Sequence, residues 1–154
     1  MLKTLELTVF IILGFLPSLS VFFVNRNMEW YKALKKPIFT PPDWVFSAIW
    51  PILFVILGLA GHVAWKQRQK REGLIYLQIF FLNTGLLILW NFLFFQQQNL
   101  ALSTGLLLII VIAGFFKFWL LMRMFPKFVK YFTVYLIWIN FAFVLNLSLL
   151  FLNR

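Results

Sequence analysis

The chain has 154 residues, of which 63% are hydrophobic and only 12% are charged, whereas an ordinary soluble domain is about 45–50% apolar and about 25% charged. With a mean hydropathy of +0.92, a globule of this size would expose far more apolar surface than soluble proteins tolerate, which excludes a water-soluble enzyme. The chain has no cysteine, which excludes disulfides and thiolate metal sites, and its net charge of +10 lies mostly between apolar runs. Basic loops of this kind indicate contact with anionic lipid headgroups or an acidic ligand and not with nucleic acid.

Five apolar runs are each long enough to cross about 30 Å of hydrocarbon as a helix, which takes around 20 residues. Backbone amides cannot stay unpaired in lipid, and the runs do not alternate between polar and apolar residues as barrel strands do, so helices are expected. We therefore predict an all-α integral membrane protein that forms a single domain over residues 1–154. Its five transmembrane helices are expected at residues 5–25, 43–65, 73–95, 100–122 and 128–152.

The first apolar run also has some features of a signal peptide. Lys3 precedes it, and Ser18-Leu19-Ser20 is similar to a cleavage site. However, the apolar stretch continues through Val24 and exceeds the usual 7–15 residues, which favours a retained span. The basic residues at the ends of the runs favour an N-terminus on the inner side of the membrane.

The connection between the first and second runs, residues 26–42, is the longest of the four. Its three prolines exclude a continuous helix, whereas residues 29–34 favour a short one. Trp30 and Tyr31 are typical of the aromatic belt at a membrane interface, and this is one interpretation of the segment. The other interpretation is a lid, in which a proline-stiffened aromatic loop closes the mouth of a cavity in the bundle.

From Trp30 onward the sequence is W-Y-K-A-L-K-K-P-I-F-T-P-P-D-W-V-F-S-A-I-W. This run closely resembles the translocator protein family, also called the tryptophan-rich sensory proteins or TspO/MBR family, whose pattern is approximately W-Y-x-x-L-x-K-P-x-x-x-P-P-x-W-V-x-G-P-x-W. Ser47 and Ala48 stand where the pattern has Gly-Pro. The resemblance continues in the first, third and fifth runs, at Pro17-Ser18-Leu19, Trp90, Phe94-Phe95, Trp138, Ala142 and Asn146.

The resemblance implies a five-helix bundle, often a homodimer, with a pocket beneath the first loop that accepts porphyrins such as protoporphyrin IX and flat aromatic drugs. It also implies light-dependent porphyrin degradation in bacterial members, for which Trp50 and Trp138 match the tryptophans implicated as catalytic. No metal and no cofactor is expected, since porphyrin would be the ligand or the substrate. The residues expected to bind ligand are Tyr31, Pro41, Ala48, Trp50, Phe54, Asn83, Trp90, Trp138 and Ala142.

The spacing of two residue stripes is consistent with such a pocket. Trp50, Phe54 and Gly58 lie four apart, so one face of the second helix offers two aromatic rings and then a gap. The same spacing recurs on the fifth helix at Trp138, Ala142 and Asn146. The two stripes could form a slot in which each stacked aromatic pair contributes about 0.5–1.5 kcal/mol beyond area burial. Ordinary packing of tryptophans against small residues gives the same spacing.

Asparagines inside the spans are further candidates, because an unpaired amide in hydrocarbon is costly. Asn83 lies seven residues before Trp90 and therefore on the same helix face, where it would bond either a ligand or another helix. For Asn140 and Asn146, hydrogen bonds between helices are favoured.

Two basic side chains also lie inside the expected spans. Lys117 is flanked by aromatic residues and is expected to extend toward the membrane interface. His62, the only histidine, is expected to be solvated or interfacial and not to bind haem iron.

General acid–base catalysis lacks its parts, because all four acidic residues lie at span ends or in loops. Two function classes remain: a receptor for porphyrins and other hydrophobic ligands, or a light- and oxygen-dependent enzyme in which an excited porphyrin takes an electron from an indole. A small-solute transporter is a third candidate, disfavoured by the lack of an acid within any span. The expected partners are hydrophobic small molecules, membrane lipids and a second copy of the chain, in a bacterial plasma membrane.

Overall fold

The structure is a computed structural model that describes residues 2–24 and 27–154. Within these residues the regular structure is helical, and four helices are long and apolar enough to cross a membrane. They are α4 (Asp43–Lys66), α5 (Arg71–Asn91), α6 (Leu100–Met124) and α7 (Pro126–Leu152), and α5 continues into a π-helical turn, η2 (Phe92–Gln96). The prediction of an all-helical membrane protein is confirmed.

The first apolar run is divided into three short elements, so the prediction of one uninterrupted helix there is wrong. They are α1 (Leu2–Gly14), the 3₁₀ turn η1 (Leu16–Leu19) and α2 (Ser20–Phe23). Pro17 is the cause, because its ring has no N–H for the carbonyl four residues earlier and clashes with it. Residue 25, the predicted end of this span, lies outside the described residues.

α1 lies against α4 at a close contact between two glycines. A Cβ atom at Gly58 would lie 2.5 Å from the carbonyl oxygen of Phe10 and 2.7 Å from the Cα of Ile11. A Cβ at Gly14 would meet the carbonyl oxygen of Phe54. The missing side chain of Gly58 therefore makes room for the backbone of α1. It does not leave space for a ligand, as the spacing of Trp50, Phe54 and Gly58 had suggested.

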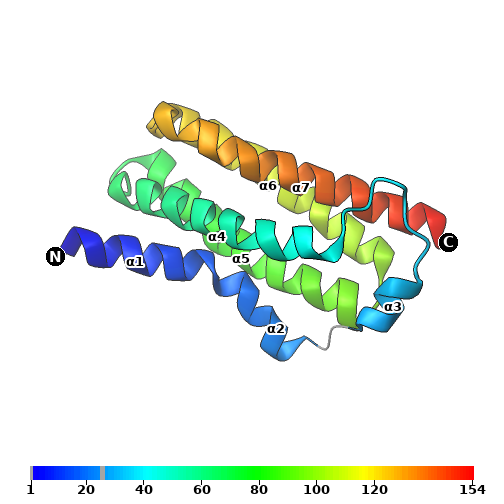
Figure 1. The fold of residues 1–154 in the computed structure, drawn as a ribbon. Helices are drawn as coiled ribbons and strands as arrows, with labels where there is room; N and C mark the ends of the chain where they lie inside the picture. The colour runs from blue at the N-terminus through cyan, green and yellow to red at the C-terminus, as the bar shows by residue number, and fades with distance from the viewer. Residues whose placement is uncertain (1, 25–26) are drawn as a thin grey trace.

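The four long helices pack as a bundle in which α6 and α7 form an antiparallel hairpin (Figure 1). α4 contacts α1, α5 and α7, and α5 packs on α6. Large apolar side chains such as Ile109, Ile112 and Ile137 are exposed on the outside of the bundle. Lipid tails solvate such a surface without cost, whereas exposing it to water would be unfavourable.

The described part of the connector, residues 27–42, lies at the end of the bundle that also carries the C-terminus (Figure 1). Its short helix α3 (Met28–Ala33) is capped by Asn27, whose side-chain oxygen accepts a hydrogen bond of 2.9 Å from the backbone N–H of Trp30. Asn153, just after α7, accepts a hydrogen bond from the backbone N–H of Lys35 at 2.9 Å and donates one to the Lys35 carbonyl at 3.0 Å. These two bonds tie the connector to the end of α7.

Candidate ligand cavity

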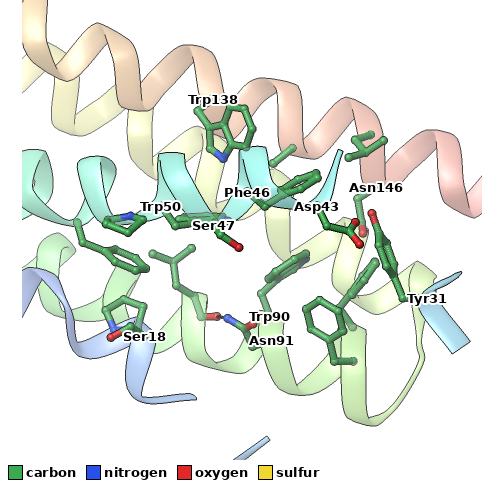
Figure 2. A pocket seen from close by; sticks show the side chains of 18 of the residues that line it. Ser18, Tyr31, Asp43, Phe46, Ser47, Trp50, Trp90, Asn91, Trp138 and Asn146 are labelled. Carbon is green, nitrogen blue, oxygen red and sulfur yellow. Dashed lines mark hydrogen bonds between the residues drawn. The ribbon is translucent and has the colours of Figure 1, made fainter. Parts of the chain in front are cut away.

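A cavity of about 450 Å³ lies inside the bundle. In Figure 2, lining residues of α4 and α7 lie above it, and lining residues of η1 and α5 lie below it. Small-molecule sites in proteins have volumes of about 300–1,000 Å³. The side chains around this cavity come from η1, α3, α4, α5, η2 and α7. Residues from both ends of the chain therefore meet at one site.

Aromatic rings form much of the cavity wall. On α4, Trp50 stacks on Phe54 with 5.6 Å between ring centroids and an interplanar angle of 29°. Trp90 at the end of α5 stacks on Phe94 of η2 at 5.0 Å and 22°. Figure 2 shows the indole of Trp138 projecting from α7 toward α4. Three indoles from three helices thus line one cavity, where they can stack on a planar aromatic ligand.

The cavity also has a few polar groups that are not satisfied by the protein. The indole Nε1 atoms of Trp90 and Trp138 are buried and have no hydrogen-bond partner within the described part of the chain. Pro51 has no N–H to donate to the carbonyl of Ser47 four residues earlier, as a regular helix residue would, and both residues line the cavity. The Ser47 carbonyl therefore lacks its usual helical partner, and the two indole Nε1 atoms are unpartnered but enclosed within the wall.

Tyr31 of α3 covers one end of the cavity (Figure 2) and is almost completely buried. Its ring lies 6.0 Å from that of Phe94 and 6.2 Å from that of Phe95. Burial, and then the nearby carboxylate of Asp43, raise the pKa of the Tyr31 phenol above its usual value near 10. The phenol therefore keeps its proton at neutral pH and is a hydrogen-bond donor.

Six of the nine residues expected to bind ligand line this cavity, and Pro41, Ala48 and Asn83 do not. Ala48 is exposed on α4 and lies two residues before Trp50, which places it about 200° around the helix from that ring. The Nδ2 of Asn83 donates a buried hydrogen bond of 3.2 Å to the Tyr135 hydroxyl. Of the two partners expected for Asn83, a ligand or another helix, the structure contains the second. The six residues that line the cavity are Tyr31, Trp50, Phe54, Trp90, Trp138 and Ala142.

The two asparagines of α7, Asn140 and Asn146, bond different kinds of partner. Asn146 donates hydrogen bonds to the hydroxyls of Ser103 at 3.1 Å and Thr104 at 2.8 Å, so the expected bond between helices is confirmed. Asn140 instead donates to the carbonyl of Leu136 in its own helix at 2.8 Å, so the expectation of a bond to another helix is wrong for it. An amide can bond the carbonyl one turn earlier wherever no partner from a neighbouring helix faces it.

Several lining residues were missing from the sequence prediction. Phe46 lies four residues before Trp50 and is part of the same helical stripe, so extending that stripe backward would have found it. Leu145 and Leu149 follow Ala142 at helical spacing and give no chemical signal of their own. Phe95 enters the lining from η2, where the Gln97 N–H bonds the carbonyl of Phe92 five residues earlier, and nothing in the sequence predicted this π-helical turn.

His62 does not line the cavity. Its ring lies 6.1 Å from that of Phe10 of α1, and the side chain is buried, so of the two expected positions the solvated one is wrong, and the interfacial one stays a prediction. The reason is tertiary, because α1 covers this face of α4. Within residues 2–24 and 27–154, no three histidine, aspartate or glutamate side chains gather in a group that could hold a metal ion.

Comparison with known proteins assigns the family. The sequence profile of the TspO/MBR family matches residues 7–152. The tryptophan-rich protein TspO of Archaeoglobus fulgidus is 33% identical over 142 residues, covering 86% of this chain and 86% of the relative. The protein of the same name from Chlorobaculum tepidum is 33% identical over 141 residues, covering 85% and 84%. The translocator protein of Sus scrofa is 30% identical over 139 residues, covering 84% and 81%. Together with four helices that can cross a membrane, these matches show that the chain is an integral membrane protein of the TspO/MBR family.

Proposed function

We propose that this protein is a membrane receptor that binds protoporphyrin IX and similar flat hydrophobic ligands in the cavity between α4, α5 and α7. The whole chain is one domain with five membrane crossings, of which the α1–α2 segment makes the first. The residues that bind ligand are the six predicted residues that line the cavity, together with Phe46 and Phe94. A bacterial plasma membrane is the proposed location.

The observation that carries this proposal is the arrangement of three indoles around one cavity of about 450 Å³. A tetrapyrrole is planar and apolar on both faces, so it gains stacking energy from Trp50, Trp90 and Trp138 together. The Tyr31 phenol, at one end of the cavity, supplies a donor for a polar group at the ligand edge. Apolar walls with a few convergent polar groups are typical of small-molecule sites.

A light- and oxygen-dependent porphyrin-degrading enzyme is the second candidate. Trp50 and Trp138 line the same cavity, and this favours the enzyme candidate. An indole stacked on an excited porphyrin can transfer an electron to it, and dissolved oxygen is then the oxidant. This chemistry needs no acid or base and no metal from the protein.

One experiment separates the two candidates. Purified protein in detergent is titrated with protoporphyrin IX, followed by quenching of tryptophan fluorescence, and then illuminated in air while porphyrin absorbance is recorded. The variants Trp50→Phe and Trp138→Phe should bind up to roughly tenfold more weakly, since each loses part of a stacking contact worth about 0.5–1.5 kcal/mol.

The matched control is Trp119→Phe, because Trp119 lies on the outer surface of α6, away from the cavity. An enzyme should lose its protein-specific product in the two cavity variants and keep it in the control. Binding without such a product would eliminate the enzyme candidate. If the control weakened binding as much as the cavity variants, the assignment of the receptor site to this cavity would be wrong.

The connector is proposed to act as the lid of this cavity, and Asn153 tests that role. Asn153→Ala removes both hydrogen bonds to Lys35, each worth about 1 kcal/mol. Opening of the lid should then be easier, and bound porphyrin should dissociate roughly 5- to 30-fold faster in stopped-flow measurements. Ser148→Ala is the control, since the Ser148 hydroxyl bonds its own helix at Val144. Equal dissociation rates for both variants would show that the connector does not gate the cavity.

A homodimer remains a proposal. Small residues let the helices of two subunits approach closely, but Gly14 is used inside the subunit, at the contact with α4. Ala101 and Gly105 lie exposed on α6, and a Cβ at Gly105 would meet nothing within 4 Å. A second copy could approach closely at this face. Cross-linking in mild detergent, compared between the wild type and Gly105→Leu, tests this interface.

A further inference from the structure

The ligand cavity contains a single charge, and that charge is negative. Of the residues that line the cavity within the described part of the chain, Asp43 is the only one with a charged side chain. The other lining residues are apolar, aromatic or neutral and polar. The whole chain has 14 lysines and arginines against 4 acidic residues, so an acid in this place is not a consequence of its composition. One carboxylate therefore sets the charge that a ligand meets in the cavity.

Asp43 is the first residue of α4 and lies at the end of the cavity that Tyr31 covers. Figure 2 shows its carboxylate beside the Tyr31 side chain. The carboxylate is close enough to the phenol to contribute to the raised pKa of Tyr31. Unlike the enclosed indole nitrogens of the wall, the Asp43 side chain is exposed. A ligand in the cavity can therefore reach this carboxylate.

No basic side chain among the described residues neutralises Asp43, which forms no ion pair and no side-chain hydrogen bond with any of them. Lys36 of the connector does not line the cavity. Its Nζ lies 4.7 Å from the ring centroid of Tyr31 and donates a hydrogen bond of 3.0 Å to a backbone carbonyl one turn earlier. Lys117 does not line the cavity either. It is completely buried, with its Nζ 4.9 Å from the ring centroid of Tyr135, so the expectation that it extends toward the membrane interface is wrong.

We propose that Asp43 makes the cavity selective for flat aromatic ligands that carry a cationic group, such as a protonated amine, at the edge facing the connector. This inference rests on the proposed receptor function and names the ligand class that the same site prefers. The aromatic walls hold the ring by stacking. The carboxylate then attracts a cation at the ligand edge and repels an anion there. The Tyr31 phenol beside it is a neutral donor and does not cancel this charge.

The same charge orients protoporphyrin IX. Both carboxylates of this porphyrin lie on one edge of its ring, and like charges repel. That edge should therefore point away from Asp43, toward the opposite end of the cavity. An otherwise identical porphyrin with amines in place of the carboxylates should turn the same edge toward Asp43.

The test uses three porphyrins that share one ring and differ in charge: protoporphyrin IX, its neutral dimethyl ester, and its cationic diamide with N,N-dimethylethylenediamine. Each is titrated into the full chain in nonionic detergent at low ionic strength, where charges are least screened. Binding is followed by quenching of tryptophan fluorescence. Each porphyrin is compared with itself between variants, so its own partition into detergent cancels.

Asp43→Asn removes the charge and keeps nearly the same shape. It should weaken binding of the cationic porphyrin roughly 3- to 10-fold and tighten binding of protoporphyrin IX roughly 2- to 5-fold. The affinity of the neutral ester should stay within about twofold of the wild type. Asp43→Glu keeps the charge and should keep the wild-type order of the three affinities.

The matched control is Glu29→Gln, which removes the same charge from an exposed position of α3 that does not line the cavity. It should leave all three affinities near those of the wild type. Equal effects of Glu29→Gln and Asp43→Asn would overturn the inference, because the net charge of the protein would then be the cause.

Two further outcomes would overturn it. One is a change in the same direction for all three porphyrins in Asp43→Asn, since an altered shape moves them together whereas a charge moves cation and anion in opposite directions. The other is unchanged affinity of both charged porphyrins in Asp43→Asn. In either case, binding of the neutral ester to the wild type would leave the receptor function in place. If none of the three porphyrins bound the wild type, the proposed function itself would be wrong, and the charge preference with it.

Discussion

Replacing Ala142 by phenylalanine should reduce the affinity for protoporphyrin IX by more than roughly 100-fold. Ala142 lines the cavity between Trp138 and Asn146 on α7, and its methyl group leaves space beside the indole. A phenyl ring would occupy the volume that a planar ligand needs. One additional methylene in a binding pocket already costs about 1–3 kcal/mol, and a ring adds far more. Titration followed by tryptophan fluorescence measures the loss.

Ala48→Phe is the matched control, because Ala48 is exposed on α4 and does not line the cavity. Both variants should keep the helical circular dichroism spectrum and the elution volume of the wild type, so that lost binding reports on the cavity and not on folding. Normal affinity in Ala142→Phe would show that porphyrin binds elsewhere on the protein. The same loss in Ala48→Phe would lead to the same conclusion.

The second large effect is expected at the contact between α1 and α4. Gly58→Val places a branched side chain where a Cβ alone would lie 2.5 Å from the Phe10 carbonyl oxygen and 2.7 Å from the Ile11 Cα. These are backbone atoms, so the clash can be relieved only if the whole helix moves. Overpacking of this kind costs about 1–3 kcal/mol or more, which corresponds to a decrease in Tm of roughly 2–12 °C.

Movement of α1 should also withdraw the ring of Phe10 from Trp65, whose ring centroid lies 5.8 Å away. The tryptophan fluorescence of Gly58→Val should therefore change together with Tm. Gly85→Val is the control, since a Cβ at this exposed position of α5 meets nothing within 4 Å, and its Tm should stay near that of the wild type. If the two variants lost the same stability, the decrease would come from β-branched residues in helices generally and not from the contact with α1.

Much of the cavity could be predicted because its residues belong to a continuous motif and to two regular stripes. Trp50 with Phe54, and Trp138 with Ala142, follow the four-residue spacing that places side chains on one helix face, and all four line the cavity. Gly58 has the same spacing but meets α1 instead. A stripe identifies residues that share a face, but it does not state which neighbour that face meets along its length.

The sequence by itself determined the four long helices and most of their ends, but not the 3₁₀ turn that divides the first apolar run. The predicted runs 43–65, 100–122 and 128–152 differ by at most two residues at either end from α4, α6 and α7. This accuracy has a local physical cause, because backbone groups in hydrocarbon must bond within their own helix, and loops begin where polar residues and prolines begin. The aromatic motif and its family were also evident at this level.

The tertiary structure decided which face of each helix points inward. Lipid solvates apolar side chains as well as the protein interior does, so helices that are apolar all around carry little information about their rotation. Asn83 therefore bonds Tyr135 instead of lining the cavity, His62 lies beneath α1, and Lys117 is enclosed by α7. Each outcome depends on a neighbouring helix distant in sequence, and no local pattern encodes that neighbour.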